Sequence, residues 1–567
     1  MTLYVLCFVL FLVGLYGLLT KRDLIKIILS SGIMGYACNL MLVLFGYRRG
    51  AVYPILEKGK EAAAMVDPLP QAMVLTSIVI ELGVTALLAA FLIPLLSRRS
   101  DVRAAYLSLA AATSLLVLAG YAFFGRGGET VVYRMSAWKL PIGINLVLDA
   151  FSAFMLMMVS LIALTSLVYS FKYIRHLGRD SRYYALFMIL VAGMNGVVVT
   201  GDLFNLFVFM EVALIAALAL VAYGGRAHEF EASFKYAVMA SLSASLILLA
   251  IAVVYGATST LGLATISQGL ARQSPLLVLW VGGLFMAGFS VKAAAMPFHA
   301  WLPDAHSSAP SPISAMLSGV LIKTLGVYVL IRLFYNVLGA PPLFLQVFLV
   351  LGTISIILGN ILAVGQWDFK RLLAYSSIGQ IGYILLAMGL DTTLGMAGAV
   401  FHMINHAVFK SLLFYNAGAL ETALGTRDLR QMGNVAKLLP VTSQTSMIAS
   451  LSISGIPPFN GFFSKLVIII AAVQAGQPVL ALVAVVGSLF TMAAFMKVQR
   501  YGLRSERPVE KLVGHVDGWM KTAMIILAAL CLATSLLVVP GIREVTLDPV
   551  VKVIMDKTGY ATTVLGK

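Results

Sequence analysis

A small set of ionisable side chains lies inside long apolar stretches of this 567-residue sequence. A charged side chain at the centre of a bilayer costs at least about 2.5 kcal/mol on insertion scales, so such residues usually serve a purpose. Burial and neighbouring charges shift the pKa of such groups, which lets them gain and lose protons near neutral pH. We therefore expect a path for protons built from Glu81, Glu211, Lys292, Lys323, His402, His406, Lys410 and Lys465.

Glu211 and Lys292 lie in the most informative surroundings. Glu211 is in the middle of GDLFNLFVFMEVALIAALAL, and Lys292 lies in FSVKAAAMPFHAWLPDAH, shortly before Pro297. A proline breaks a helix, and broken helices at membrane depth line cavities rather than lipid. We expect Lys292 to face such a cavity. For Glu211, a salt bridge that only holds two helices together is the alternative.

Further residues extend the set. Lys323 lies in LIKTLGVY, where a lysine that reaches the membrane surface from a helix end is the alternative. His402, His406 and Lys410 recur at helical spacing in HMINHAVFKSLLF and so share one helix face. Packing histidines or a zinc site are the alternatives there, but HEXXH is absent and Lys410 continues the face, which favours a proton relay without metal. Lys465 follows a second Pro/Gly break in ISGIPPFNGFFSKLV.

The composition indicates an all-α polytopic membrane protein. Hydrophobic residues make up 60% of the chain and charged residues 11%, and the mean hydropathy is +0.96, whereas soluble domains carry about 25% charged residues. Because a span needs roughly 20 apolar residues, we expect about 16 transmembrane helices. They cover 3–20, 25–46, 72–97, 104–124, 145–170, 183–200, 202–223, 235–255, 276–300, 311–336, 341–363, 372–389, 394–420, 442–474, 478–500 and 519–540.

The distribution of charge predicts the orientation. The net charge of +16 could suggest a nucleic-acid partner, but more than half of the 40 lysines and arginines fall in alternate loops between apolar helices. The positive-inside rule explains this better and makes those loops cytoplasmic, with both termini outside the cell inner (plasma) membrane. The sequence has no GxGxxG, P-loop, CxxC or haem motif. We therefore expect no bound cofactor and no redox or hydrolytic chemistry in this chain.

The segments quoted above, together with KAAAMPFHAWLPDAHSSAPSPISAMLSGVLIKTLGVY, resemble in order and spacing the antiporter-like subunits of respiratory complex I, Mrp-type multisubunit cation/proton antiporters and energy-converting membrane hydrogenases. The resemblance covers residues 101–545 and looks closest to the Mrp D-type protein. It implies inverted repeats of five helices with two broken helices. It also implies a coupled pair at Glu211 and Lys292, and a path that runs through Lys323 and the 402–410 helix and ends at Lys465.

Residues 1–100 resemble the three-helix small subunit, Mrp C or its complex I counterpart, through SGIMGYACNLMLVLFG and DPLPQAMVLTSIVIELGVTALLAAF. Glu81 matches the glutamate of that subunit's third helix, whereas the second-helix glutamate of the complex I version has no counterpart near Gly35. We thus expect a fusion of a small-subunit segment (1–100), an antiporter-like domain (101–545) and a C-terminal tail (546–567). Helix 72–97 should replace the first helix of the Mrp D-type protein, with no extra helix between 97 and 104.

These observations predict a proton-translocating subunit of a multisubunit Na⁺ or K⁺/H⁺ antiporter, with other membrane subunits as partners. The alternative is an ion-pumping subunit of a membrane-bound hydrogenase or complex I-like oxidoreductase. A self-sufficient transporter and a structural scaffold account for fewer of the observations. Asp149 and Asp202, near predicted span ends, are expected to cap helices.

Overall fold

The computed structural model describes residues 2–20, 101–125, 128–135, 143–177, 180–506 and 513–566, with single residues between 26 and 44. Helix 72–97, Glu81 and the junction between 97 and 101 lie outside the described residues. The predictions for them therefore stay predictions. The first described helix, α1, covers Thr2–Thr20.

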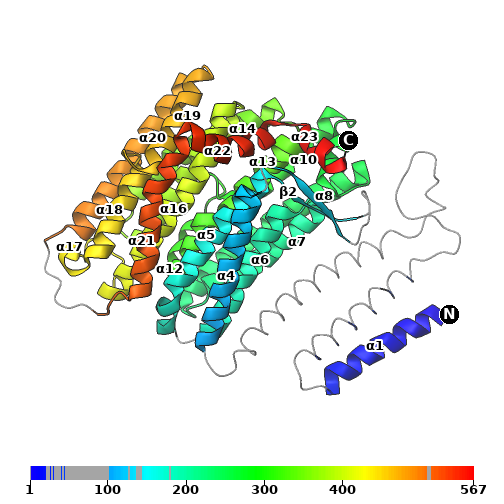
Figure 1. Ribbon diagram of the computed structural model, residues 1–567, viewed down its shortest axis with the longest axis horizontal. Coiled ribbons are helices and arrows are strands. Elements are labelled where there is room, and N and C mark those ends of the chain that lie inside the picture. The colour runs from blue at the N-terminus through cyan, green and yellow to red at the C-terminus, as the bar shows by residue number, and fades with distance from the viewer. Residues whose placement is uncertain are drawn as a thin grey trace.

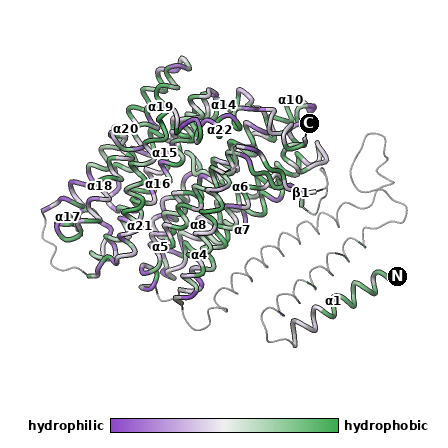
Figure 2. Tube along the Cα trace, viewed as in Figure 1, coloured by the Kyte–Doolittle hydropathy of each residue, from purple (hydrophilic) through white to green (hydrophobic). Residues whose placement is uncertain are grey.

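The described chain folds into long helices that run side by side (Figure 1). Eleven of them are long and apolar enough to cross a membrane, and Figure 2 shows hydrophobic residues along their length and hydrophilic ones near the ends. They are α4 (Asp101–Phe124), α5 (Ala150–Tyr173), α6 (Asp180–Val199), α7 (Leu203–Val221), α8 (Ala227–Thr258), α10 (Pro275–Ala293), the Ser311–Val337 helix that begins as α12 (Ser311–Met316), α14 (Pro342–Gly365), α15 (Phe369–Gly389), α20 (Pro478–Lys497) with η7 (Val498–Leu503), and α21 (Gly518–Ala533).

Two further elements complete the set of crossings. One is α16 (Thr393–Leu424), and the other is a helix in two halves, α18 (Pro440–Ser454) and α19 (Asn460–Gln474). Every crossing expected between residues 101 and 545 is therefore present. The polytopic all-helical fold is confirmed.

Both predicted helix breaks are present. After α10, Ala294 adopts a left-handed conformation with φ 53°, and the chain resumes as α11 (Trp301–Ser308). After α18, Gly455 adopts φ 77° before α19 begins. Each break contains a cis peptide bond, Met296–Pro297 in the first and Pro457–Pro458 in the second. The Pro- and Gly-rich signals in the sequence thus mark interruptions at corresponding points of two separate helices.

One predicted span boundary is wrong. Residues 145–148 form strand β2 (Asn145–Leu148), which pairs antiparallel with β1 (Val131–Arg134). Helix α5 starts only at Ala150, because the Asp149 side chain accepts a hydrogen bond from the Ser152 N–H at 2.8 Å and caps the helix. A short apolar run such as NLVL has no periodicity that separates a strand from a helix.

Charged loops meet at one end of the bundle, which we call the basic side. Asp304 pairs there with Lys235 at 2.9 Å and with Arg371 at 2.7 Å. The N–H of Asn434 donates to the Ser505 carbonyl at 2.6 Å. Loops that are distant in sequence but predicted to share a side of the membrane therefore contact one another.

The opposite end carries the β-hairpin and the C-terminal helices α22 (Pro540–Met555) and α23 (Gly559–Leu565). In Figure 1, α22 runs across the ends of the spanning helices. The Asn336 amide donates to the Val553 carbonyl at 3.1 Å, and Lys557 pairs with Asp391 at 2.8 Å. The residues expected to form a tail are therefore largely helical and packed against the bundle.

Candidate functional site

Glu211 and Lys292 form an ion pair between α7 and α10. Their Oε1 and Nζ atoms are 3.5 Å apart, and the Lys292 side chain is 2% exposed, whereas that of Glu211 is 24% exposed. Lys292 lies in the last turn of α10, where the partial negative charge of a helix C-terminus favours a cation. The helix break therefore ends directly beside a buried charge, as the sequence predicted.

A glycine contact brings the next lysine's helix against this pair. A Cβ at Gly326 would lie 2.5 Å from the Cα of Ala293, so only glycine permits the observed approach to α10. Gly326 belongs to a π-helical segment, Lys323–Tyr328, within the Ser311–Val337 helix. Such segments are frequent at functional sites because they widen the helix and re-aim its side chains.

Lys323 is fully buried in that segment. Its ammonium donates to the Ser318 carbonyl at 2.9 Å and to the carbonyl of Gly319. The Ser318 hydroxyl lies 2.8 Å from the Ser377 hydroxyl on α15. Lys323 is therefore held by backbone carbonyls of its own helix and sits next to a hydroxyl bridge to a neighbouring helix.

Lys410 completes that bridge from the other side. The fully buried Lys410 ammonium donates to the Leu373 carbonyl at 2.6 Å and to the Ser376 hydroxyl at 2.5 Å. The Ser377 hydroxyl donates to the same Leu373 carbonyl at 2.9 Å. Lys323 and Lys410 are thus joined through polar groups of α15 and not separated by apolar side chains.

The two predicted histidines lie on the same face of α16 as Lys410. Both are fully buried, and their rings are parallel with centroids 6.3 Å apart. His402 Nδ1 lies 3.0 Å from the Ser464 hydroxyl on α19. His406 has no hydrogen-bond partner for either ring nitrogen among the described residues. The polar stripe inferred from the sequence is therefore real, and part of its hydrogen-bonding capacity is unused.

Lys465 lies at the second helix break. Its ammonium donates to the Ile453 carbonyl at 2.8 Å and lies 4.8 Å from the centroid of the Tyr383 ring. The Tyr383 ring is in turn 5.6 Å from that of His402. A cation over an aromatic face is stabilised electrostatically. Tyr383 therefore connects the lysine of the broken helix to the histidine face of α16.

The sequence reasoning missed His306, which follows the first break on α11. His306 is fully buried between Trp301 and Phe414, and neither ring nitrogen has a partner among the described residues. It is close enough to Lys323 and Lys410 for their charges to interact. It was missed because PDAHSSAP is polar enough to be taken for a loop, although it lies next to a predicted break.

These residues form what we call the central row. Among the residues that the structure describes, none of its lysines forms an ion pair with a carboxylate, in contrast to Lys292. Its members are His306, Lys323, His402, His406, Lys410 and Lys465. The row runs from the first helix break to the second.

A cavity of about 340 Å³ opens near the row on the basic side. Lys370 and Glu421 line it, with Nζ and Oε2 3.1 Å apart, and Lys370 also donates to the Ala309 carbonyl at 3.2 Å. Ser308, which follows His306 closely in the chain, lines the same cavity. The cavity therefore places a carboxylate and an ammonium between the basic side and the buried histidine.

A second buried ion pair was not recognised from the sequence. Arg332 pairs with Asp149 through Nη2, donates to the Ser152 hydroxyl at 3.1 Å and donates to Asn336 Oδ1 at 3.1 Å. Asn336 binds α22, as described above. This pair lies at the end opposite the basic side and links the hairpin junction to the C-terminal helices, so it is a structural contact. Asp149 and Asp202 both cap helices, as expected.

The comparisons with known proteins agree with this arrangement. The family described as NADH:quinone oxidoreductase/Mrp antiporter, TM matches residues 200–491. The chain 4L family of NADH-ubiquinone/plastoquinone oxidoreductase matches residues 2–112, and the complex I chain 5 N-terminus matches residues 135–188. The expected joining of a small-subunit segment to an antiporter-like domain is thereby confirmed, while the boundary near residue 100 stays a prediction.

Individual relatives cover most of the chain. It is 36% identical to the N subunit of the NADH-quinone oxidoreductase of Desulforudis audaxviator, over 67% of this chain and 79% of that protein. It is 33% identical to the D-type protein of the Na(+)/H(+) antiporter of Alkalihalophilus pseudofirmus, over 78% of this chain and 89% of that protein. A chain of the Mrp complex from Dietzia sp. DQ12-45-1b superimposes with a TM-score of 0.78 at 28% identity, covering 85% of this chain and 98% of that one. The chain therefore belongs to the NADH:quinone oxidoreductase/Mrp antiporter family of membrane subunits.

Proposed function

We propose that this chain is the proton-translocating subunit of a multisubunit monovalent cation/H⁺ antiporter. The observation that carries the proposal is the central row, with three buried lysines that have no carboxylate partner in the described part of the chain, next to the Glu211–Lys292 ion pair. The Na(+)/H(+) antiporter relative and the Mrp complex chain support this function and an assembly with other membrane subunits.

In this proposal protons enter from the basic side. The cavity that holds Glu421 and Lys370 collects them, and His306 is the first buried group beyond it. Unpaired buried ring nitrogens, such as those of His306 and His406, call for water partners. Water at these positions would connect His306 to the lysines of the row.

Within the row, the proton passes from Lys323 to Lys410 through the Ser318–Ser377 hydroxyls and the Leu373 carbonyl region. It then follows the histidine face to Lys465. Because two like charges about 10 Å apart repel by about 1.7 kcal/mol at an effective dielectric constant of about 20, protonating one lysine disfavours protonating the next. This repulsion is comparable to the roughly 2.3 kcal/mol that one charge exchanges per 100 mV of membrane potential.

Replacement of Lys292 tests this function. Lys292→Ala removes the cation that holds Glu211 and faces the break, so antiport measured with a pH-sensitive dye in membrane vesicles should be abolished while the complex remains assembled. Lys437→Ala is the matched control, because Lys437 is an exposed lysine on the basic side. Wild-type antiport in an assembled Lys292→Ala complex would refute the proposal.

A redox-driven pump is the second candidate, and the 36% identity to an NADH-quinone oxidoreductase protein favours it. The ion chemistry of the row would be the same, but electron transfer elsewhere in the complex would drive it. Purification of the native complex separates the two functions. Small membrane subunits alone support the antiporter, whereas iron–sulfur subunits support the redox complex.

The orientation and the role of Glu81 belong to the same proposal. The basic side faces the cytoplasm, because lysines and arginines are retained on that side. Labelling of a Ser505→Cys variant in intact cells and in inverted vesicles tests this, since a cytoplasmic cysteine reacts with an impermeant reagent only in inverted vesicles. Glu81 would relay protons between the small-subunit segment and its neighbours, and Glu81→Gln should then reduce antiport.

A further inference from the structure

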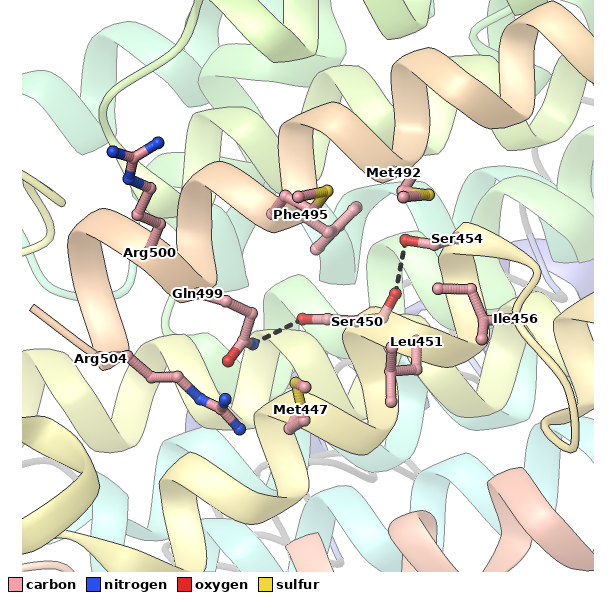
Figure 3. Close-up of a pocket in the computed structure, with 11 residues that line it drawn as sticks. Met447, Ser450, Leu451, Ser454, Ile456, Met492, Phe495, Gln499, Arg500 and Arg504 are labelled. Atoms are coloured by element: carbon pink, nitrogen blue, oxygen red, sulfur yellow. Dashed lines mark hydrogen bonds between the residues drawn. The ribbon is translucent and has the colours of Figure 1, made fainter.

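A groove of about 370 Å³ lies between α18 and α20 with its continuation η7, away from the central row (Figure 3). One part is apolar, and Arg500, Arg504 and Gln499 lie together at the other end. The apolar lining consists of Met447, Leu451, Ile456, Met492, Phe495 and Met496. The groove thus has an apolar channel with a basic mouth.

The basic mouth lies at the level of the membrane surface. Next to Arg500, the Tyr501 ring contacts Trp367 with centroids 5.6 Å apart, and the Lys497 ammonium lies 4.8 Å from the centroid of the Trp367 ring. Trp, Tyr and Lys gather where headgroups meet the hydrocarbon region. The apolar end of the groove, toward Met492 and Ile456, therefore extends into the hydrocarbon region.

The two arginines at the mouth differ from their neighbours on the basic side. Arg371, Arg427 and Arg430 each form an ion pair with an aspartate. Arg500 and Arg504 are exposed, and within the described ranges neither has a carboxylate partner. Two guanidinium groups without counter-charge at a headgroup-level mouth favour an anionic ligand, and the planar guanidinium matches phosphate geometry.

We propose that this groove binds an anionic phospholipid of the leaflet on the basic side. The headgroup phosphate lies against Arg500 and Arg504, and an acyl chain follows Met447, Met492 and Phe495. Methionine side chains adapt to a flexible apolar ligand, and basic pockets between spanning helices are typical sites for anionic headgroups. A helix from another subunit, about 10–12 Å wide, would lie over the groove and not within it.

The site borders the second helix break. Ser454 and Ile456, which line the groove, flank Gly455, and the Ser454 hydroxyl donates to the Ser450 carbonyl at 2.7 Å. Gln499 donates to the Ser450 hydroxyl at 3.0 Å and joins η7 to the same helix (Figure 3). An acyl chain in the groove therefore contacts the segment that positions Lys465.

Photocrosslinking of the assembled complex in phosphatidylcholine nanodiscs tests the site. The probes are phosphatidylglycerol and phosphatidylcholine with the same diazirine-bearing acyl chain, and peptide mass spectrometry locates the crosslinks. We expect phosphatidylglycerol to label residues 447–451 and 492–496 in preference to phosphatidylcholine. Each arginine should favour the anionic headgroup about fivefold, so Arg500→Gln/Arg504→Gln should reduce this labelling about 25-fold.

Arg103→Gln/Arg175→Gln is the matched control, because both arginines are exposed and lie on the basic side. It should leave the labelling unchanged. Met492→Trp keeps both arginines but fills the channel, so it should also abolish labelling, and it decides the question if the double arginine variant does not assemble. Equal labelling by the two lipids, an equal loss in the control, or crosslinks from these positions to another protein subunit would each overturn the proposal.

Discussion

The Glu211–Lys292 pair and the central row hold buried positive charge in different ways. Lys292 has a carboxylate 3.5 Å away, and that carboxylate is itself 24% exposed. Lys323, Lys410 and Lys465 are bound by backbone carbonyls and a serine hydroxyl, without a carboxylate in the described part of the chain. The pair can therefore remain charged, whereas each proton in the row must be stabilised by dipoles and by water.

The difference indicates a division of labour. A buried cation with a counter-charge is a stable element whose loss leaves its partner unpaired. Cations held only by dipoles compete with one another, since each added charge raises the cost of the next. In this account the pair sets the electrostatic state of the first helix break, and the row carries the protons from there to the second.

The largest effect is expected in the row. Lys410→Met removes a proton-transfer group and should reduce antiport about 100-fold or more. Lys410→Arg should be almost as inactive, because arginine keeps its proton. Proton flux into proteoliposomes measures both variants against Lys437→Met. If Lys410→Arg restores transport, Lys410 acts as a structural charge and not as a proton carrier.

The pair should respond differently, in stability. Glu211→Gln leaves Lys292 buried without its counter-charge, which should cost about 3 kcal/mol and lower the thermal midpoint of the complex. The double variant Glu211→Gln/Lys292→Met should recover most of that loss, although not transport. Thermal unfolding of the purified complex measures this. Additive losses in the double variant would show that the two side chains do not form an energetic pair.

The close helix contact between the two regions gives a third test. Gly326→Ala places a methyl group about 2.5 Å from the Ala293 backbone and should cost about 1–3 kcal/mol through overpacking. Because the helix of Lys323 must shift away from α10, antiport should fall with it. Gly283→Ala is the control, since a Cβ there meets nothing within 4 Å. Equal stability of the two variants would contradict the packing argument.

The smallest effect is expected at Tyr383. Tyr383→Phe keeps the aromatic face beneath the Lys465 ammonium and loses only the hydroxyl bonds to Ala484 and Ser488. Tyr383→Leu removes the face and should cost an additional ~0.5–2 kcal/mol, or about 3- to 30-fold in transport rate at most. Matched flux assays compare the two. If leucine is tolerated as well as phenylalanine, the ring does not stabilise Lys465.

Much of this fold follows from simple signals in the sequence. Long apolar runs predicted the crossings from α4 to α21, and Pro297 and Gly455 predicted the two breaks. The helical spacing of His402, His406 and Lys410 predicted their common face. These features depend on local sequence, where one residue type at one spacing has a direct structural consequence.

The remainder depends on contacts between distant segments. The Asn145–Leu148 strand needs its partner at Val131–Arg134, and the burial of His306 is visible only when α11 packs between other helices. The Asp149–Arg332 pair joins the start of α5 to the end of another span. No local period carries this information.

High-resolution cryo-electron microscopy of the assembled complex tests the central claim most directly. We predict ordered water between the buried ring nitrogens of His306 and His406 and the ammonium groups of Lys410 and Lys465, which would form a continuous hydrogen-bonded connection. A dry interval of apolar packing between these groups, in a map that resolves water elsewhere in the protein, would contradict the account.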